Sequence, residues 1–374
     1  MGVTMMTGTL GVRLGSRTVD ELLLHTDALL EAVLQELAEM VARTATEGER
    51  AGRVRRGPAH IDLVGELTER TRQHGKRFRP VLAHRGWVAG DGDHRTYEHI
   101  VRVAAALELL QLFALIQDDV MDRSHSRRGR TCLHVSAAGQ HRAADGLGDP
   151  VLFGDSVATL VSDLALSEAS LLIAPTTSEV RAAWRVMTVE MVEGQLLDLT
   201  HTASRGRDLK TAMRIARSKS GRYTISRPLQ LGALVAGAEP SLVRGLGGWG
   251  DLVGDAFALR DDVLGVWGDP ARTGKPAGDD LRSGKPTALL AWASELLPEA
   301  DRPLLVAFDA GTLDDRDGTA LQGAMIHAGV LERAEQAISD LVANAERALA
   351  RLDIDTQTRD ALREIASAVA WRNS

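Results

Sequence analysis

At 374 residues, the chain can form one large domain or two of ordinary size. Its apolar share of 44% and charged share of 25% are average for a globular protein, and a net charge of −7 argues against a general nucleic-acid binder. The single cysteine, Cys132, excludes an internal disulfide framework and fits a reducing compartment. We find neither a signal-peptide pattern nor a continuous run of about 18 apolar residues, so we expect a cytoplasmic protein without a transmembrane helix.

Helical periodicity dominates the chain. After a loose tail over residues 1–17, an amphipathic helix is predicted from Val19 to about Thr46, followed by an exposed loop over 47–60. Further helices are expected near 61–73, 96–121, 134–146, 152–173, 177–200, 206–236, 240–266, 284–296, 300–310, 316–328, 331–352 and 356–371. No alternating β segment and no fixed repeat is evident. The pattern predicts an all-α fold over residues 18–374, one large helical bundle in a single domain.

The first candidate site follows an apolar run from Leu107 to Ile116. Three acids come next, Asp118, Asp119 and Asp122, and the pair Arg127-Arg128 lies just downstream. Residues four apart share a helix face, so Asp118 and Asp122 are expected to point the same way. Mg²⁺ binds through one or two carboxylates plus waters and substrate phosphates, and arginine forks match phosphate oxygens. The stretch therefore indicates a magnesium–diphosphate site, with a solvated acidic helix end as the plainer alternative.

A second stretch repeats this theme. An apolar helix ends in Asp261-Asp262, and a Gly/Pro-rich loop follows that carries Lys275, Asp279, Asp280 and Lys285. Two acidic helix ends predict two helices that face each other across a cavity, with metal ions bridging a diphosphate between them.

Two other patterns are weighed against simpler explanations. Four of the five lysines (Lys76, Lys219, Lys275 and Lys285, but not Lys210) lie beside glycine or Ser-Gly, where a compact ammonium group is a plausible phosphate contact. Gly245–Gly250 matches a dinucleotide-binding pattern by letter, but no strand precedes it, so we expect close helix packing instead. The eleven histidines show no zinc-binding spacing.

Taken in order, five motifs resemble the class I trans-isoprenyl diphosphate synthases over roughly residues 60–370. They are Gly75-Lys76-Arg77-Phe78-Arg79-Pro80, the DDVMD stretch with Arg127-Arg128-Gly129, Gly194-Gln195, Lys219-Ser220, and DDVLGVWGDPARTGKPAGDDL. The resemblance implies antiparallel helices around a deep central cavity, a homodimer, and Mg²⁺-dependent head-to-tail condensation of isopentenyl diphosphate with an allylic diphosphate (dimethylallyl, geranyl or farnesyl).

The resemblance also implies a set of metal ligands. Asp118 and Asp122 would hold two Mg²⁺ ions, with Asp119 in support, and Asp261 would hold one more, with Asp262 beside it, for about three ions in all. The second motif departs from the usual pattern because Gly265 stands where a third aspartate often occurs, and Ala258 where a glutamine often does.

The same comparison assigns the phosphate contacts. The allylic diphosphate would be held by Arg127, Lys219 and Lys275, and the isopentenyl diphosphate by Lys76, Arg79 and Arg128. Gln111 replaces a histidine that many members use for that second substrate, and Ser220 replaces the usual threonine but keeps the hydroxyl.

Product length in this family depends on the residues below the first acidic motif. Phe113 and Ala114 precede Asp118 by five and four residues, about 6–7.5 Å along a helix axis. One aromatic residue with one alanine predicts geranylgeranyl diphosphate, while farnesyl or longer products stay open if the floor is set by residues such as Phe153 or Trp184.

Two other functions fit the same fold class. A class I terpene cyclase would need an aromatic-lined pocket, whereas this chain has 5 Phe, 6 Trp and 2 Tyr and no recognisable Asn/Asp–Ser/Thr–Glu metal triad. A non-catalytic regulatory subunit of a prenyl synthase would usually lack the first acidic motif, which is complete here.

Overall fold

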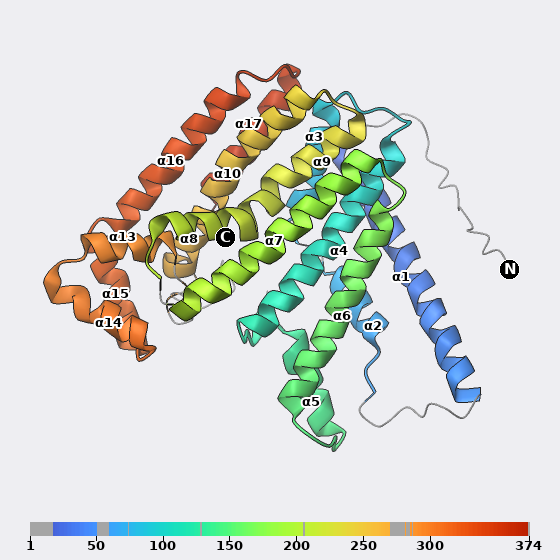
Figure 1. The fold of residues 1–374 in the computed structure, drawn as a ribbon, viewed down its shortest axis with the longest axis horizontal. Coiled ribbons are helices and arrows are strands. Elements are labelled where there is room, and N and C mark those ends of the chain that lie inside the picture. The colour runs from blue at the N-terminus through green and yellow to red at the C-terminus, as the bar shows by residue number, and fades with distance from the viewer. Residues whose placement is uncertain are drawn as a thin grey trace.

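The computed structural model describes residues 18–50, 60–73, 75–127, 129–204, 206–269, 281, 285 and 287–372. Long helices fill this part of the chain, as expected (Figure 1). The first half contains α1 (Val19–Arg50), α2 (Leu63–Thr71), α3 (Phe78–Ala89), α4 (Tyr97–Met121), α5 (Leu133–Ala143), α6 (Pro150–Ile173) and α7 (Ser178–Ser204). The second half contains α8 (Leu209–Ala216), the π-helix η1 (Arg217–Ser226), α9 (Arg227–Ala236), α10 (Pro240–Trp267), α13 (Ala288–Leu296), the 3₁₀ turn η2 (Glu299–Asp301), α14 (Arg302–Ala310), α15 (Asp315–His327), α16 (Val330–Leu349) and α17 (Thr356–Ala370).

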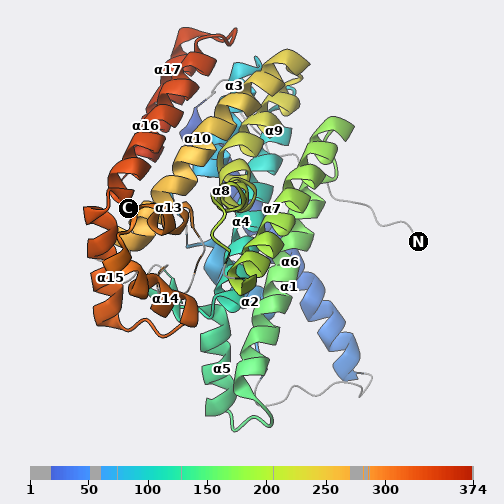
Figure 2. The same cartoon turned by 60° about the vertical axis from the view of Figure 1, so that its left-hand side comes forward.

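Helix α4 lies at the centre because it is apolar on all sides. Nearly every residue from Ile100 to Leu110 is buried, and the core around it includes side chains of α1, α3, α6, α7 and α9. A helix without a polar face is stable only inside a protein. Helices α16 and α17 pack on the far side of α10, where they build a separate part of the core (Figures 1 and 2).

Two of the described helices, α4 and α6, are apolar and long enough to cross a membrane by length and composition alone. Their most apolar windows are 56% and 50% buried within the bundle. Core helices of globular proteins pass the same test, so these two helices give little support for a membrane span.

The segment predicted as one helix over 206–236 is the clearest difference from expectation. It is divided into α8, the π-helical turn η1 and α9. Helical periodicity gives no warning of such a turn, since a π-helix is a local widening of an α-helix. A smaller difference is the antiparallel pair β1 (Ser126–Arg127) and β2 (Arg130–Thr131), a hairpin too short for its residues to show alternation.

Glycines of α10 allow the close packing expected from Gly245–Gly250. A Cβ atom at Gly250 would lie 2.6 Å from Cα of Ser226, and one at Gly247 would lie 2.3 Å from the Gln230 side chain. The glycine pattern therefore serves helix contacts, and the dinucleotide interpretation is wrong for this fold.

Candidate active site

A cavity of about 1310 Å³ opens between the central helices. It is lined by residues of α2, α3, α4, α6, α7, α8, η1 and α10, together with Lys285 and with Arg372, which follows α17. Its volume exceeds the roughly 300–1,000 Å³ of common small-molecule pockets, so the cavity can hold a long substrate.

Three acids end helix α4, where the helix dipole already places partial negative charge. Nearby cations offset this charge. Arg127, on the short hairpin that follows α4, donates from Nε to Asp119 at 2.7 Å and from its terminal nitrogen to Asp118 at 3.1 Å. The Lys285 ammonium lies 2.9 Å from Asp122. The acidic helix end is therefore one ionic network with cations from two other segments.

Lys219 reaches this network from the π-helix η1. Its ammonium lies 3.1 Å from Asp118 and donates to Asp198 of α7 at 2.6 Å. Burial alone would raise the pKa of Asp118, but Lys219, Lys285 and Arg127 outweigh it and hold the pKa below its ordinary value. Burial likewise disfavours the Lys219 ammonium, while Asp118 and Asp198 raise the Lys219 pKa above its ordinary value. Both groups are therefore charged at neutral pH.

The second acidic pair lies on the same cavity. Asp261 and Asp262 are both lining residues, and they lie near the end of α10, which runs to Trp267 and so matches the helix predicted over 240–266. Arg372, just beyond α17, forms an ion pair with Asp261 and lies 4.2 Å from the centre of the Phe257 ring. The two acidic segments thus share one cavity, which is the arrangement their sequence predicted.

Basic and polar groups line another part of the wall. Lys76, Arg79 and Gln111 all face the cavity. Arg79 lies over the Tyr223 ring at 4.0 Å and donates to the Thr224 hydroxyl at 2.6 Å. Burial raises the pKa of Tyr223 to about 12, so its hydroxyl stays protonated and donates to the Gln111 side-chain oxygen. A hydrogen bond from Gln111 to a phosphate would therefore come from its amide nitrogen.

Phe113 and Ala114 also line the cavity, below Asp118 on α4. The two residues named as alternative floors do not. Trp184 is buried in the core around α4, and Phe153 packs on the His141 ring, with 4.6 Å between ring centres.

The site contains residues that the sequence did not predict, and some predicted residues lie outside the part of the chain that the structure describes. Ser220 lines the cavity, whereas Arg128 and Lys275 lie outside the described residues. Asp198 and Tyr223 were not predicted, because both occur within ordinary helical patterns and nothing in the sequence marks them as neighbours of Lys219 or Gln111. Lys285 was noted for its glycine neighbour, but its pairing with Asp122 needed the fold.

The donor set fits Mg²⁺. Asp118, Asp261 and Asp262 face the cavity, and Oδ1 of Asp118 lies 3.1 Å from the Lys219 ammonium, so the carboxylate is held in its charged form. Within the described residues, no group of three or more His, Cys, Asp or Glu side chains is close enough to enclose an ion. Such a site suits Mg²⁺, which keeps several waters and binds through few carboxylates together with substrate phosphates.

Known proteins resemble this chain along most of its length. The sequence model for the Polyprenyl synthetase family matches residues 62–316. A short chain isoprenyl diphosphate synthase of Methanothermobacter thermautotrophicus is 30% identical, with 83% of this chain and 92% of that protein aligned. An octaprenyl diphosphate synthase of Escherichia coli is 31% identical, with 80% and 86% aligned.

A solved structure agrees with these relatives. The geranylgeranyl pyrophosphate synthase of Corynebacterium glutamicum, complexed with isoprenyl diphosphate and magnesium, has a TM-score of 0.84 and 34% identity and covers 95% of this chain and 99% of its own. The chain therefore belongs to the polyprenyl synthetase family of all-α trans-prenyltransferases, whose substrates are isoprenoid diphosphates.

Proposed function

We propose that the protein condenses isopentenyl diphosphate with an allylic diphosphate, dependent on about three Mg²⁺ ions, and that its main product is geranylgeranyl diphosphate. One observation carries the proposal: two acidic segments and two sets of cations face a single cavity whose wall includes Phe113. Asp118, Asp122 and Asp261 would hold the ions, with Asp119 and Asp262 beside them. Bound Mg²⁺ would supply positive charge at the diphosphate that leaves the allylic carbon.

The cations of the chain have separate tasks in this proposal. Arg127, Lys219 and Lys275 hold the allylic diphosphate, with Ser220 donating a hydroxyl. Breaking the allylic carbon–oxygen bond adds negative charge to that diphosphate, and cations already fixed around it stabilise the charge as it develops. Lys76, Arg79, Arg128 and the Gln111 amide hold the isopentenyl diphosphate. No side-chain nucleophile is required.

The product assignment depends on α4. Phe113 narrows the cavity below Asp118, while Ala114 leaves room beside it, and both belong to the cavity wall. Relatives with short and long products lie at nearly equal identity, so the cavity wall is a better guide to chain length than overall similarity.

The test is incubation with Mg²⁺, isopentenyl diphosphate and, in separate reactions, dimethylallyl, geranyl or farnesyl diphosphate, with products identified by mass spectrometry. Geranylgeranyl diphosphate as the main product, lengthened by Phe113→Ala, would support the assignment. Farnesyl or longer products from the unaltered enzyme would refute the product and keep the reaction. A cyclic hydrocarbon would indicate a terpene cyclase, and no turnover with any allylic primer would indicate a regulatory subunit.

We also propose that the single domain forms a homodimer in the cytoplasm. Helices α6 and α7 are joined by the short turn between Ile173 and Ser178, and both carry large exposed apolar residues: Leu152, Leu160, Leu171, Val186, Val189 and Leu196. Exposed apolar surface favours association, and a twofold dimer is the commonest assembly. Light scattering would show a mass twice that of the chain, and Val189→Glu would shift it to monomer. An unaltered monomeric mass for the native protein would refute the dimer.

A further inference from the structure

The π-helix η1 has two distinct faces. One face points to the cavity and carries Lys219, Ser220, Tyr223 and Thr224. The other carries arginines that pair with carboxylates of the neighbouring helices. A π-helical turn is rare and is found mainly at functional sites, so it needs specific contacts to persist.

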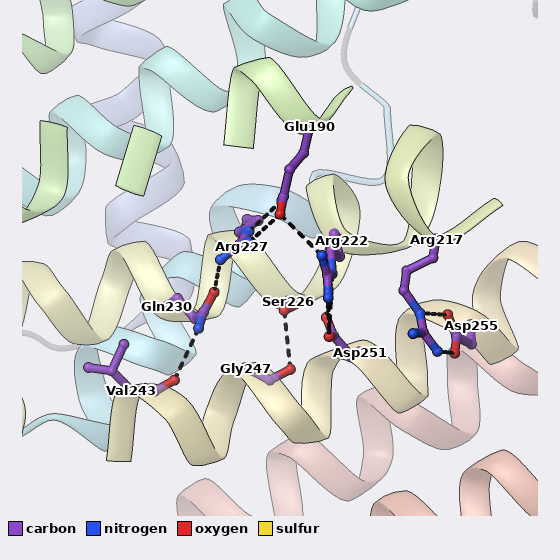
Figure 3. Close-up of polar contacts among 10 residues, drawn as sticks. All are labelled: Glu190, Arg217, Arg222, Ser226, Arg227, Gln230, Val243, Gly247, Asp251 and Asp255. Atoms are coloured by element: carbon purple, nitrogen blue, oxygen red, sulfur yellow. Dashed lines mark hydrogen bonds and ion pairs between the residues drawn. The ribbon is translucent and has the colours of Figure 1, made fainter. Parts of the chain in front are cut away.

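These arginine contacts form one separate pair and one connected group (Figure 3). Arg217 donates through two nitrogens to Asp255 of α10. Arg222 donates to Asp251 of α10 at 3.0 Å and to Glu190 of α7 at 3.1 Å. The network continues to α9, since Arg227 donates to Glu190 at 2.8 and 2.6 Å. We call these three arginines and three carboxylates the arginine clamp.

The spacing of the clamp matches the wide turn. Its arginines are five residues apart, the hydrogen-bond interval of a π-helix. In a regular α-helix of about 3.6 residues per turn, Arg227 would lie roughly 280° around the axis from Arg217, between the directions of Tyr223 and Thr224. The arginines can therefore all face away from the cavity only while the turn stays wide. Pairing with Glu190, Asp251 and Asp255 favours this register.

Backbone contacts hold η1 close to α7 and α10, whereas its register depends on the arginine–carboxylate pairs. A Cβ atom at Gly194 of α7 would lie 2.6 Å from the backbone nitrogen of Lys219. A Cβ atom at Gly221 would lie 2.8 Å from the Gly254 carbonyl oxygen of α10. These are backbone contacts of glycines, without interlocking side chains. They limit the distance between the segments but do not fix how η1 is rotated about its own axis.

We propose that Glu190, Asp251 and Asp255 are positioning residues, which act through the clamp arginines to keep η1 in the register that aims Lys219 and Tyr223 into the cavity. The inference rests on the proposed binding of the allylic diphosphate by Lys219. Glu190 is the central member because it alone accepts from two of the arginines and joins η1 to α9. Charge-assisted pairs of this kind are stronger and more directional than neutral hydrogen bonds.

The first experiment neutralises Glu190 without changing its shape. In Glu190→Gln, the KM for the allylic diphosphate should rise at least about tenfold, since a misplacement of about 1 Å in a binding group can cost up to a hundredfold. Calorimetry with Mg²⁺ and inorganic diphosphate should show a matching loss of affinity, while helix content stays constant. The matched control is Glu346→Gln, which removes the pair between Glu346 and Arg363 on the outer helices α16 and α17 and should change neither value.

A double-mutant cycle separates positioning from general destabilisation. If Glu190 acts through Lys219, adding Glu190→Gln to Lys219→Ala should raise KM by less than about twofold more, because the two residues share one effect. Full additivity, or an unchanged KM in Glu190→Gln, would overturn the positioning role. An unchanged KM in Lys219→Ala would instead refute the assignment of Lys219 on which the inference rests.

A second variant covers the case in which Glu190→Gln fails to fold. Asp251→Asn removes one of the two partners of Arg222 and leaves Glu190 in place. Asp251→Asn should raise KM by less than Glu190→Gln does. When it is combined with Lys219→Ala, its effect should again be less than additive. Additive behaviour of this variant would overturn the inference equally.

Discussion

The two acidic segments of the cavity differ in how firmly the protein holds them. The side chains of Asp118, Asp119 and Asp122 are 21%, 10% and 19% exposed, and they pair with Arg127, Lys219 and Lys285. Asp261 is 48% exposed and pairs with Arg372. The first segment is therefore preorganised, whereas the second is open to solvent and to ions. The comparison predicts that substitutions in the two segments have unequal effects.

The largest effect is expected for Asp118→Ala. This change removes the carboxylate at the centre of the first network, and we expect kcat to fall about a thousandfold or more, equivalent to about 4 kcal/mol of transition-state stabilisation. Single-turnover product formation measures it. A loss below tenfold would show that the first segment is not the main metal site.

A smaller loss is expected for Asp261→Ala. The second segment is exposed, so waters can replace a lost ligand, and activity should fall about ten- to a hundredfold and recover partly at higher Mg²⁺. A Mg²⁺ titration of initial rates tests this. Equal losses for Asp118→Ala and Asp261→Ala, with no recovery in either, would remove the contrast between the segments.

Arg372→Ala should act in the opposite direction. Its guanidinium pairs with Asp261 and competes there with Mg²⁺. Removing it should lower the Mg²⁺ concentration for half-maximal rate by up to about fivefold, since an exposed ion pair is worth about 1 kcal/mol at most. A higher Mg²⁺ requirement would mean that Arg372 assists the bound metal–diphosphate instead of competing with it.

The smallest effect concerns pH. Because the Asp118 pKa lies below its ordinary value of 3.8 in the folded protein, its stabilising contribution is present above pH 3.8 and is lost as the pH falls through the folded-state pKa. Lys285 is one of the cations that lower this pKa, so Lys285→Gln should raise it and reduce that contribution by less than about 1 kcal/mol.

Urea unfolding at neutral pH and at a pH well below 3.8, where the folded-state carboxylate becomes protonated, measures the difference. The difference in the free energy of unfolding between Lys285→Gln and the native protein should be largest at neutral pH. It should shrink in acid, where the Asp118 carboxylate loses its charge in both proteins. A gap that grows in acid would mean that Lys285 does not act through Asp118.

Much of the site could be predicted from the sequence because its parts are local. The all-α class, the central apolar helix, and the positions of Asp118 and Asp261 on one cavity follow from periodicity and motif spacing. The partners could not be predicted, because Asp198 and Glu190 approach η1 only through the fold. The π-helical turn itself escaped notice, since one widened turn leaves the apolar pattern of residues 206–236 almost unchanged.

The close contact between Gly221 and Gly254 bears on how the enzyme can change over time. A side chain at either position would come within 2.8 Å of the carbonyl oxygen of the other, so neither can mutate first without disturbing the wall behind Lys219. Substitutions that change product length, in nature or in the laboratory, are therefore expected elsewhere than at Gly221 and Gly254. The accessible route runs through Phe113 and Leu166, where substitutions change the space for a growing chain and leave the charged groups in place.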